Sequence, residues 1–180
     1  MNHALSLSRQ RSEVPDNIDA DDEAGEQARS TLGKKAYDLN VQQYCCGGLN
    51  FGYYYDKSPI IAYDEGTPPA YGMADFTPST VPGCRVPHIW LNDGRSLYDA
   101  LGPDYTLLRF DPAIDVSQLM SEAASSLVPI QLLDVTSSES ATVYDRSLVL
   151  ARPDQHVAWR GNLAPENPRE LVDLISGRRD

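Results

Sequence analysis

The sequence has 180 residues, of which 41% are hydrophobic, and its 26 acidic and 15 basic side chains give a formal net charge of −11. This length allows one modest core but hardly two enzyme domains. The negative charge repels phosphate backbones and anionic lipid surfaces, so we expect neither nucleic acid nor membrane as a partner. No apolar run approaches the roughly 20 residues of a membrane span, and no secretory signal is recognisable, which favours a cytoplasmic location.

The first thirty residues are polar and have almost no aromatic side chains. Their acidic run consists of Asp19, Asp21, Asp22, Glu23 and Glu26. Such a composition cannot bury enough apolar surface to offset the entropy of ordering. We therefore predict that residues 1–30 form a disordered or weakly helical acidic arm.

A helical composition starts within this arm at about Glu23 and continues to about Gln43. Small and apolar residues recur there every three to four positions, whereas Gly25 and Gly33 weaken the pattern. The recurring residues are Ala24, Ala28, Leu32, Ala36 and Leu39. We predict a helix that a partner surface supports.

Residues 31–88 are predicted to hold the end of this helix, short strands and a proline-rich connector. Aromatic and β-branched residues between Phe51 and Tyr63, interrupted by Ser58-Pro59, favour two short strands around a turn. The five prolines between 67 and 88 exclude a helix or a central strand. An ordered segment of this kind must take backbone hydrogen-bond partners from a body that it crosses, as an interdomain strap does.

Residues 89–180 have the pattern of a compact α/β domain. The turn Asn92-Asp93-Gly94 separates a short strand from a helical turn at 97–101. A strand at 105–110, an amphipathic helix at 114–127 and a buried strand at 128–135 follow, and then a polar loop at 136–142.

The domain closes with a hairpin and a helix. The hairpin strands, 148–152 and 157–160, are joined by a Pro153-Asp154-Gln155 turn, and the helix covers about 168–176. A strand-helix-strand unit followed by an antiparallel hairpin and a helix is typical of a thioredoxin-like mixed sheet flanked by helices. The fold class is therefore α/β, with an extended N-terminal arm.

Four separated segments resemble the closing region of class A FAD-dependent aromatic-ring hydroxylases, with phenol-type and hydroxyphenylpropionate-type flavoprotein monooxygenases nearest. The resemblance covers about Gly48 to Gly177, and the segments are GYYYDKSPII, PGCRVPHIWL, SLYDALG with TLLRF, and RPDQHVAWRG. It implies that the stretch through Pro87 and His88 packs along flavin and substrate domains. It also implies that the rest is a thioredoxin-like C-terminal domain with a structural or subunit-contact role.

FAD and NAD(P)H are the cofactors that this resemblance implies for the family. A hydroxylase of this class needs a GxGxxG dinucleotide-binding segment and a later Gly-Asp flavin motif, and this sequence contains neither. We therefore expect no cofactor to bind the isolated chain, and we predict no catalytic, cofactor-binding or metal-binding residue.

Arg85, His88 and Trp90 lie in the most distinctive segment and are the candidates for docking to a flavin-bearing body. The competing interpretation is a structural corner whose polar groups find their hydrogen-bond partners nearby in the same chain. It is favoured because arginine and tryptophan also anchor ordinary cores. His156 and Trp159 are interpreted as fold residues.

The cysteines are Cys45, Cys46 and Cys84, an odd set without a Cys-x-x-Cys spacing. Redox activity is therefore disfavoured, as is a zinc site that would combine them with His88, because adjacent cysteines point in different directions. We expect reduced thiols, whose role the sequence leaves open.

Three functions fit these observations. The preferred one is a C-terminal module of an FAD-dependent aromatic hydroxylase, non-catalytic alone and serving assembly or dimerisation. The second is a subunit of a split flavin monooxygenase, in which residues 48–90 complete an active site with a partner chain. The third is a binding or dimerisation protein without a link to hydroxylation. The expected partner is a flavin-bearing chain or a second copy, and the aromatic substrate stays open.

Overall fold

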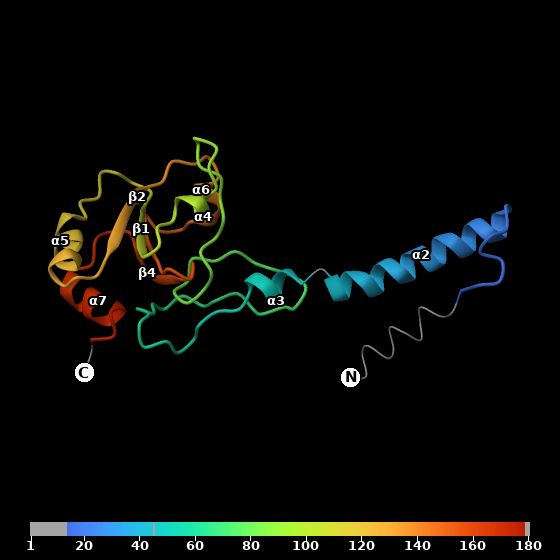
Figure 1. Ribbon diagram of the computed structural model, residues 1–180, viewed down its shortest axis with the longest axis horizontal. Coiled ribbons are helices and arrows are strands. Elements are labelled where there is room, and N and C mark those ends of the chain that lie inside the picture. The colour runs from blue at the N-terminus through green and yellow to red at the C-terminus, as the bar shows by residue number, and fades with distance from the viewer. Residues whose placement is uncertain (1–13, 45, 179–180) are drawn as a thin grey trace.

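Two unequal parts make up the described residues: a projecting helix and an α/β unit (Figure 1). The computed structural model describes residues 14–44 and 46–178. Its elements are, in order, α2 (Glu23–Tyr44), α3 (Gly47–Phe51), α4 (Leu97–Ala100), β1 (Tyr105–Arg109), α5 (Ser117–Ser125), β2 (Ile130–Asp134), α6 (Ser140–Val143), β3 (Leu148–Ala151), β4 (Val157–Gly161) and α7 (Pro168–Ile175).

The four strands form one mixed sheet in the order β2-β1-β3-β4. β1 and β2 are parallel and are connected by α5, whereas β3 is antiparallel to both β1 and β4. A parallel pair needs a crossover connection, and the short Pro153-Asp154-Gln155 turn suffices for the antiparallel hairpin. The thioredoxin-like arrangement expected from the sequence is confirmed.

The sheet has a core on each face because side chains along a strand alternate in direction. Leu107 of β1 packs with Leu119, Leu150 and Val172 between the sheet and helices α5 and α7. Leu108, the next residue, packs on the other face with a cluster that includes Val86, Ile89, Leu97 and Val149. The central strands β1 and β3 are therefore buried on both sides.

Helix α7 closes the unit because its start is well defined. The Asn167 side chain accepts a hydrogen bond from the Glu170 backbone N–H, and Pro168 occupies the first turn, where its missing N–H costs nothing. Leu171, Val172 and Ile175 on one side of the helix are buried, which follows from their spacing.

The predicted helix over 23–43 is confirmed as α2. The chain before it folds back onto its first turns, where the Arg29 guanidinium donates to the carbonyls of Ile18 and Ala20. Gly25 is required at this contact, because a Cβ there would lie 2.0 Å from the Ala20 carbonyl oxygen. Beyond this contact the described side chains of α2 are mostly exposed. The part of the predicted acidic arm at 1–13 lies outside the described residues.

The two short strands predicted between Phe51 and Tyr63 are wrong: Phe51 ends α3, and 52–63 have no regular structure. The backbone of this segment bonds to more distant parts of the chain, as Tyr55 N–H donates to the Gly83 carbonyl at 3.0 Å and Ala62 N–H to the Ala158 carbonyl at 2.8 Å. Tertiary partners therefore outweigh the local strand propensity of the tyrosines.

The connector, defined here as residues 52–88, lies along the outer edge of β4. Gly83 N–H donates to the Val157 carbonyl at 2.8 Å, and Val157 N–H donates back to the Cys84 carbonyl at 2.9 Å. Val86 N–H adds a bond to the Gln155 carbonyl at 2.8 Å. The connector thus takes its expected hydrogen-bond partners from the α/β unit of its own chain and covers one exposed sheet edge.

Three smaller expectations need correction. The strand predicted as buried, β2, lies at the other edge of the sheet and consists of half-buried and exposed residues. The polar loop at 136–142 contains the start of α6, and the short strand before Asn92 is reduced to one bridge between Trp90 and Ser96. Within the described part of the chain, no helix is both long enough and apolar enough to cross a bilayer.

Candidate functional site

Arg160 of β4 holds the connector against the unit. Its guanidinium contacts Asp64 of the connector at 2.7 Å and Asp145 at 3.0 Å, and it donates to the Thr80 hydroxyl at 2.9 Å. The arginine side chain is only 5% exposed, whereas the two carboxylates are partly open to solvent. Sequence reasoning missed this network because its members are far apart along the chain.

The two carboxylates of this network are held in their charged form. Partial burial works to raise the pKa of both Asp64 and Asp145, but hydrogen bonds and the nearby Arg160 charge outweigh it, and both pKa values lie below the ordinary range. The Gly66 N–H assists at Asp64, and the Thr80 hydroxyl assists at Asp145. The network is a structural clamp between the connector and β4.

The three predicted docking residues lie in one continuous row of stacked side chains. The Arg85 guanidinium carbon lies 5.4 Å from the Phe51 ring centre and 5.2 Å from that of Tyr98. The His88 ring lies 5.4 Å from Tyr98 and 5.1 Å from Trp90. At the other end Phe76 contacts Phe51 at 6.0 Å. We call this row the aromatic ladder; its members are Phe76, Phe51, Arg85, Tyr98, His88 and Trp90.

Buried neighbours and tyrosine hydroxyls hold the segment 85–91 in place beneath the ladder. Val86, Ile89 and Leu91 point into the core. The Tyr98 hydroxyl donates to the Val86 carbonyl at 2.6 Å, and the Tyr144 hydroxyl donates to the carbonyl of Pro87. Because Val86, Ile89 and Leu91 point inward, Arg85, His88 and Trp90 are left on the outer side of this segment.

The ladder residues are also fixed individually. Arg85 donates to the Tyr98 hydroxyl at 3.3 Å and to the Gln155 side-chain oxygen. His88 Nε2 lies 2.9 Å from the Ser96 hydroxyl oxygen, which also accepts from the Tyr98 N–H. Arg85 thus satisfies itself locally, as the structural-corner interpretation requires, while His88 is exposed and the Trp90 residue is 56% exposed. Sequence reasoning missed Phe51 and Tyr98, whose aromatic rings were assigned to a strand and to a core face.

His156 is buried beneath the connector, between the rings of Tyr53 at 5.1 Å and Tyr55 at 4.9 Å. Its Nδ1 lies 2.9 Å from the Asp154 carbonyl oxygen, and its Nε2 has no hydrogen-bond partner among the described residues. Burial lowers the pKa of His156, so the ring is neutral at neutral pH. A neutral ring packed between two tyrosines serves the fold.

The thiol of Cys84 is buried, and burial raises its pKa, so the neutral thiol is the stable form. Cys46 is half-buried, and Cys45 lies outside the described residues. Across 14–44 and 46–178, no three histidine, cysteine, aspartate or glutamate side chains are grouped as metal ligands. A raised thiol pKa is the opposite of what a redox or nucleophilic cysteine needs.

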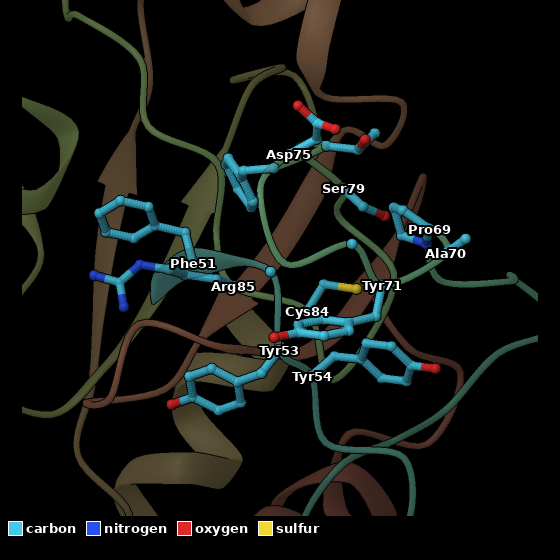
Figure 2. Close-up of a pocket in the computed structure, with 14 residues that line it drawn as sticks. Phe51, Tyr53, Tyr54, Pro69, Ala70, Tyr71, Asp75, Ser79, Cys84 and Arg85 are labelled. Carbon is cyan, nitrogen blue, oxygen red and sulfur yellow. The ribbon is translucent and has the colours of Figure 1, made fainter. Parts of the chain in front are cut away.

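Aromatic side chains of the connector enclose a small cavity beside Cys84, and Figure 2 shows the rings of Tyr53, Tyr54 and Tyr71 around that residue. Its free volume is about 20 Å³, which admits one water molecule. A flavin ring system does not fit this space, and the described residues contain no glycine-rich dinucleotide-binding loop.

Residues 79–177 match the family model of the aromatic-ring hydroxylase C-terminal region. The chain belongs to this family. One curated relative is the FAD-dependent monooxygenase opdD of Penicillium oxalicum, which is 30% identical over 151 residues. These residues are 81% of this chain and 28% of that protein. Phenol 2-monooxygenase of a Pseudomonas species is 29% identical over 168 residues, 83% of this chain and 27% of the enzyme.

In the comparison with solved structures, the similarity covers nearly the whole of this chain. The rebeccamycin biosynthetic enzyme RebC with reduced flavin is 31% identical, with a TM-score of 0.74 over 99% of this chain and 33% of RebC. The flavin-dependent monooxygenase PieE shares the fold, with a TM-score of 0.69 over 99% of this chain at 23% identity. The chain thus spans about a third of the length of these structures.

Proposed function

We propose that this chain is the C-terminal module of an FAD-dependent aromatic hydroxylase and that it serves assembly. In this proposal a flavin-bearing portion, on the same or another polypeptide, binds FAD, NAD(P)H and the aromatic substrate. The observation that carries the proposal is the projecting helix α2, which has no core of its own within the described residues and yet belongs to the part that matches a longer flavoprotein.

Helix α2 has 22 residues, and its described side chains outside the contact with 15–20 are mostly exposed. Most helical stability in proteins comes from packing against a neighbour, and Gly25 and Gly33 lower the intrinsic helix propensity of α2. The likeness to RebC covers 99% of the chain, α2 included, within a protein about three times as long. This supports a second body that packs along α2.

The chemistry of the described residues supports an assembly role. The cavity beside Cys84, of about 20 Å³, cannot hold a flavin or an aromatic substrate, and two larger hollows of about 310 Å³, one beside the first turns of α2 and one beside Tyr144, are open surface depressions. Burial disfavours the thiolate at Cys84 and the charged ring at His156, and neither group is exposed to a substrate. The acidic groups of the Arg160 clamp are occupied by their arginine.

The test is isolation of the protein, with an antibody against this chain, from the cells that produce it. We expect FAD in a one-to-one ratio to the chain, measured by its absorbance after denaturation, together with NAD(P)H oxidation that an aromatic substrate stimulates. Mass spectrometry of the flavin-bearing polypeptide separates a single-chain hydroxylase from a split one. Isolation without FAD in the same or an associated polypeptide contradicts the proposal.

A further inference from the structure

We propose that protonation of His156 releases residues 53–58 of the connector from the β3–β4 hairpin, while the α/β unit stays folded. The connector is held to the unit at two places with different chemistry. One is the His156 contact, which His156 makes with Tyr53 and Tyr55. The other is the clamp around Arg160. Acid opens the first and leaves the second closed, so the inference concerns the connector alone and does not depend on the proposed function.

The neutral His156 ring fits its site with only one of its two nitrogens bonded. Nδ1 lies 2.9 Å from the Asp154 carbonyl oxygen, which can only accept, so Nδ1 carries the proton. Nε2 is then a bare acceptor on a side chain that is 1% exposed, and it has no hydrogen-bond partner among the described residues. A proton added at Nε2 creates a buried N–H donor without an acceptor, which favours any state that brings water to the ring.

The connector offers a charged His156 ring no compensation. Its groups that face the ring are Tyr53, Tyr55 and Arg85. The tyrosine rings lie 5.1 and 4.9 Å from the imidazole, and tyrosine is uncharged below about pH 10. The Arg85 guanidinium carries a positive charge and therefore opposes a second one.

From the hairpin, Arg152 and Asp154 face the ring. Arg152 opposes the added charge, and the Asp154 carboxylate favours it but is already paired with Arg152 at 2.9 Å. Burial, assisted by the charges of Arg85 and Arg152, lowers the pKa of His156 and outweighs the effect of Asp154. The packed geometry and the surrounding charges thus both favour the neutral ring.

The part of the connector over His156 is lightly held and can open by itself. The Tyr55 hydroxyl donates to the Asp154 carboxylate at 3.3 Å, and the Arg152 guanidinium carbon lies 5.0 Å from the centre of the Tyr55 ring. Arg152 also donates to the Ser58 hydroxyl at 3.5 Å. Tyr53 is 45% exposed even in the closed state. Contacts that are few and partly open to solvent separate at a lower free-energy cost than the core.

The two attachments of the connector respond differently to acid. A histidine ring exposed to water takes up a proton near pH 6.5, whereas the packed His156 ring does so only at lower pH. The open state therefore gains population as the pH falls through about 6.5. At the clamp, the pKa values of Asp64 and Asp145 lie below the ordinary range, so both carboxylates stay charged and bonded to Arg160 in mild acid.

The experiment measures amide hydrogen exchange by NMR in the full chain at pH 7.5 and pH 5.0, corrected for the intrinsic pH dependence of exchange. Tyr55 N–H, which donates to the Gly83 carbonyl, reports the His156 contact, and Ala62 N–H, which donates to the Ala158 carbonyl, reports the clamped part. Protection at Tyr55 should fall about tenfold or more in acid, and protection at Ala62 less than about twofold. Unchanged protection at Tyr55, or an equal loss at both amides, overturns the proposal.

Two variants assign the effect to the ring. His156→Phe keeps a ring between the tyrosines, and His156→Gln keeps a donor for the Asp154 carbonyl, and neither side chain titrates. Protection at Tyr55 should be the same at both pH values in each variant. His88→Asn removes the other histidine that the structure describes and should keep the tenfold change. A change that survives in the His156 variants belongs to Asp154 and overturns the proposal.

A direct titration covers the case in which both His156 variants fail to fold. In the unaltered chain, the NMR resonances of the His156 ring should shift over the same pH range in which Tyr55 loses protection. A ring that becomes charged while Tyr55 N–H keeps its protection contradicts the coupling between the proton and the connector.

Discussion

The α/β unit and helix α2 are stabilised in different ways. The unit buries a core on each face of its sheet, and its central strands are covered on both sides. Helix α2 contacts the short segment before it, through groups such as Arg29, and its described side chains beyond that contact are mostly exposed. One region contains its own stabilising partners, whereas the proposed function gives the other region a partner in the flavin-bearing portion.

The connector has both a surface packed inside its own unit and a surface open to solvent. Its inner side pairs with β4 and is clamped by Arg160, and it covers His156. Some of its aromatic rings are also partly open to solvent, such as Tyr53 and Tyr71, which are 45% and 54% exposed. A segment without regular structure can therefore complete one domain and present a surface to another.

The largest expected effect is in the core of the unit. Leu107→Ala removes a fully buried side chain from the centre of β1 and should lower the free energy of unfolding by about 2–5 kcal/mol. Leu32→Ala in α2 is the matched change and should alter it by less than about 0.5 kcal/mol. Urea denaturation followed by tryptophan fluorescence measures both. Equal effects would mean that α2 shares the core of the unit.

The next effect concerns the clamp. Arg160→Met leaves Asp64 and Asp145 without their shared cation and should cost about 1–3 kcal/mol, discounted for the partial exposure of both carboxylates. Cleavage by a protease within the connector should become faster as well. Arg169→Met removes an exposed contact to Asp173 and should cost less than about 0.5 kcal/mol. Unchanged proteolysis in Arg160→Met would show that the β4 backbone bonds alone hold the connector.

The third effect is a dependence of stability on pH. Burial lowers the pKa of His156 in the folded state, so the unfolded chain binds the proton first as the pH falls through about 6.5. Stability should therefore fall as the pH decreases from about 6.5 towards the folded pKa, by at most about 1.4 kcal/mol per pH unit. His156→Phe should remove this slope, and His88→Asn should keep it. Urea titrations between pH 5 and 7.5 are the measurement, and a slope that survives in His156→Phe assigns it to another group.

The smallest effect is confined to α2. A Cβ at Gly33 would meet nothing within 4 Å, so Gly33→Ala should stabilise the helix locally by about 0.5–1 kcal/mol. Helical circular dichroism of the chain should increase while the urea midpoint of the α/β unit stays the same. Gly25→Ala should instead destabilise this part of the chain, because its Cβ would collide with the Ala20 carbonyl and release the segment before the helix. A loss of helix in Gly33→Ala would reveal a close neighbour at that position.

Most elements after Trp90 were predictable because they carry their own local signals, whereas α6 was expected to be a polar loop. Pro153-Asp154-Gln155 between two apolar runs predicts a hairpin, and the Asn167-Pro168 start with its following apolar positions predicts α7. The strands expected around Ser58-Pro59 were wrong because aromatic composition reports propensity and not the identity of the pairing partner. Arg85, His88 and Trp90 were recognised as distinctive, but their stacking with Phe51 and Tyr98 depends on contacts across the fold.

The amino-acid sequence by itself determined the order along the chain of the four strands and of helices α5 and α7, because spacing, capping residues and turn residues act over a few positions. It also carried the likeness to aromatic-ring hydroxylases, through short segments that persist in order. Only the tertiary structure decided that the connector pairs with β4, that Arg160 joins Asp64 and Asp145, and that six side chains form a ladder. These contacts join positions up to 96 residues apart, and their energy depends on burial and geometry that no local pattern encodes.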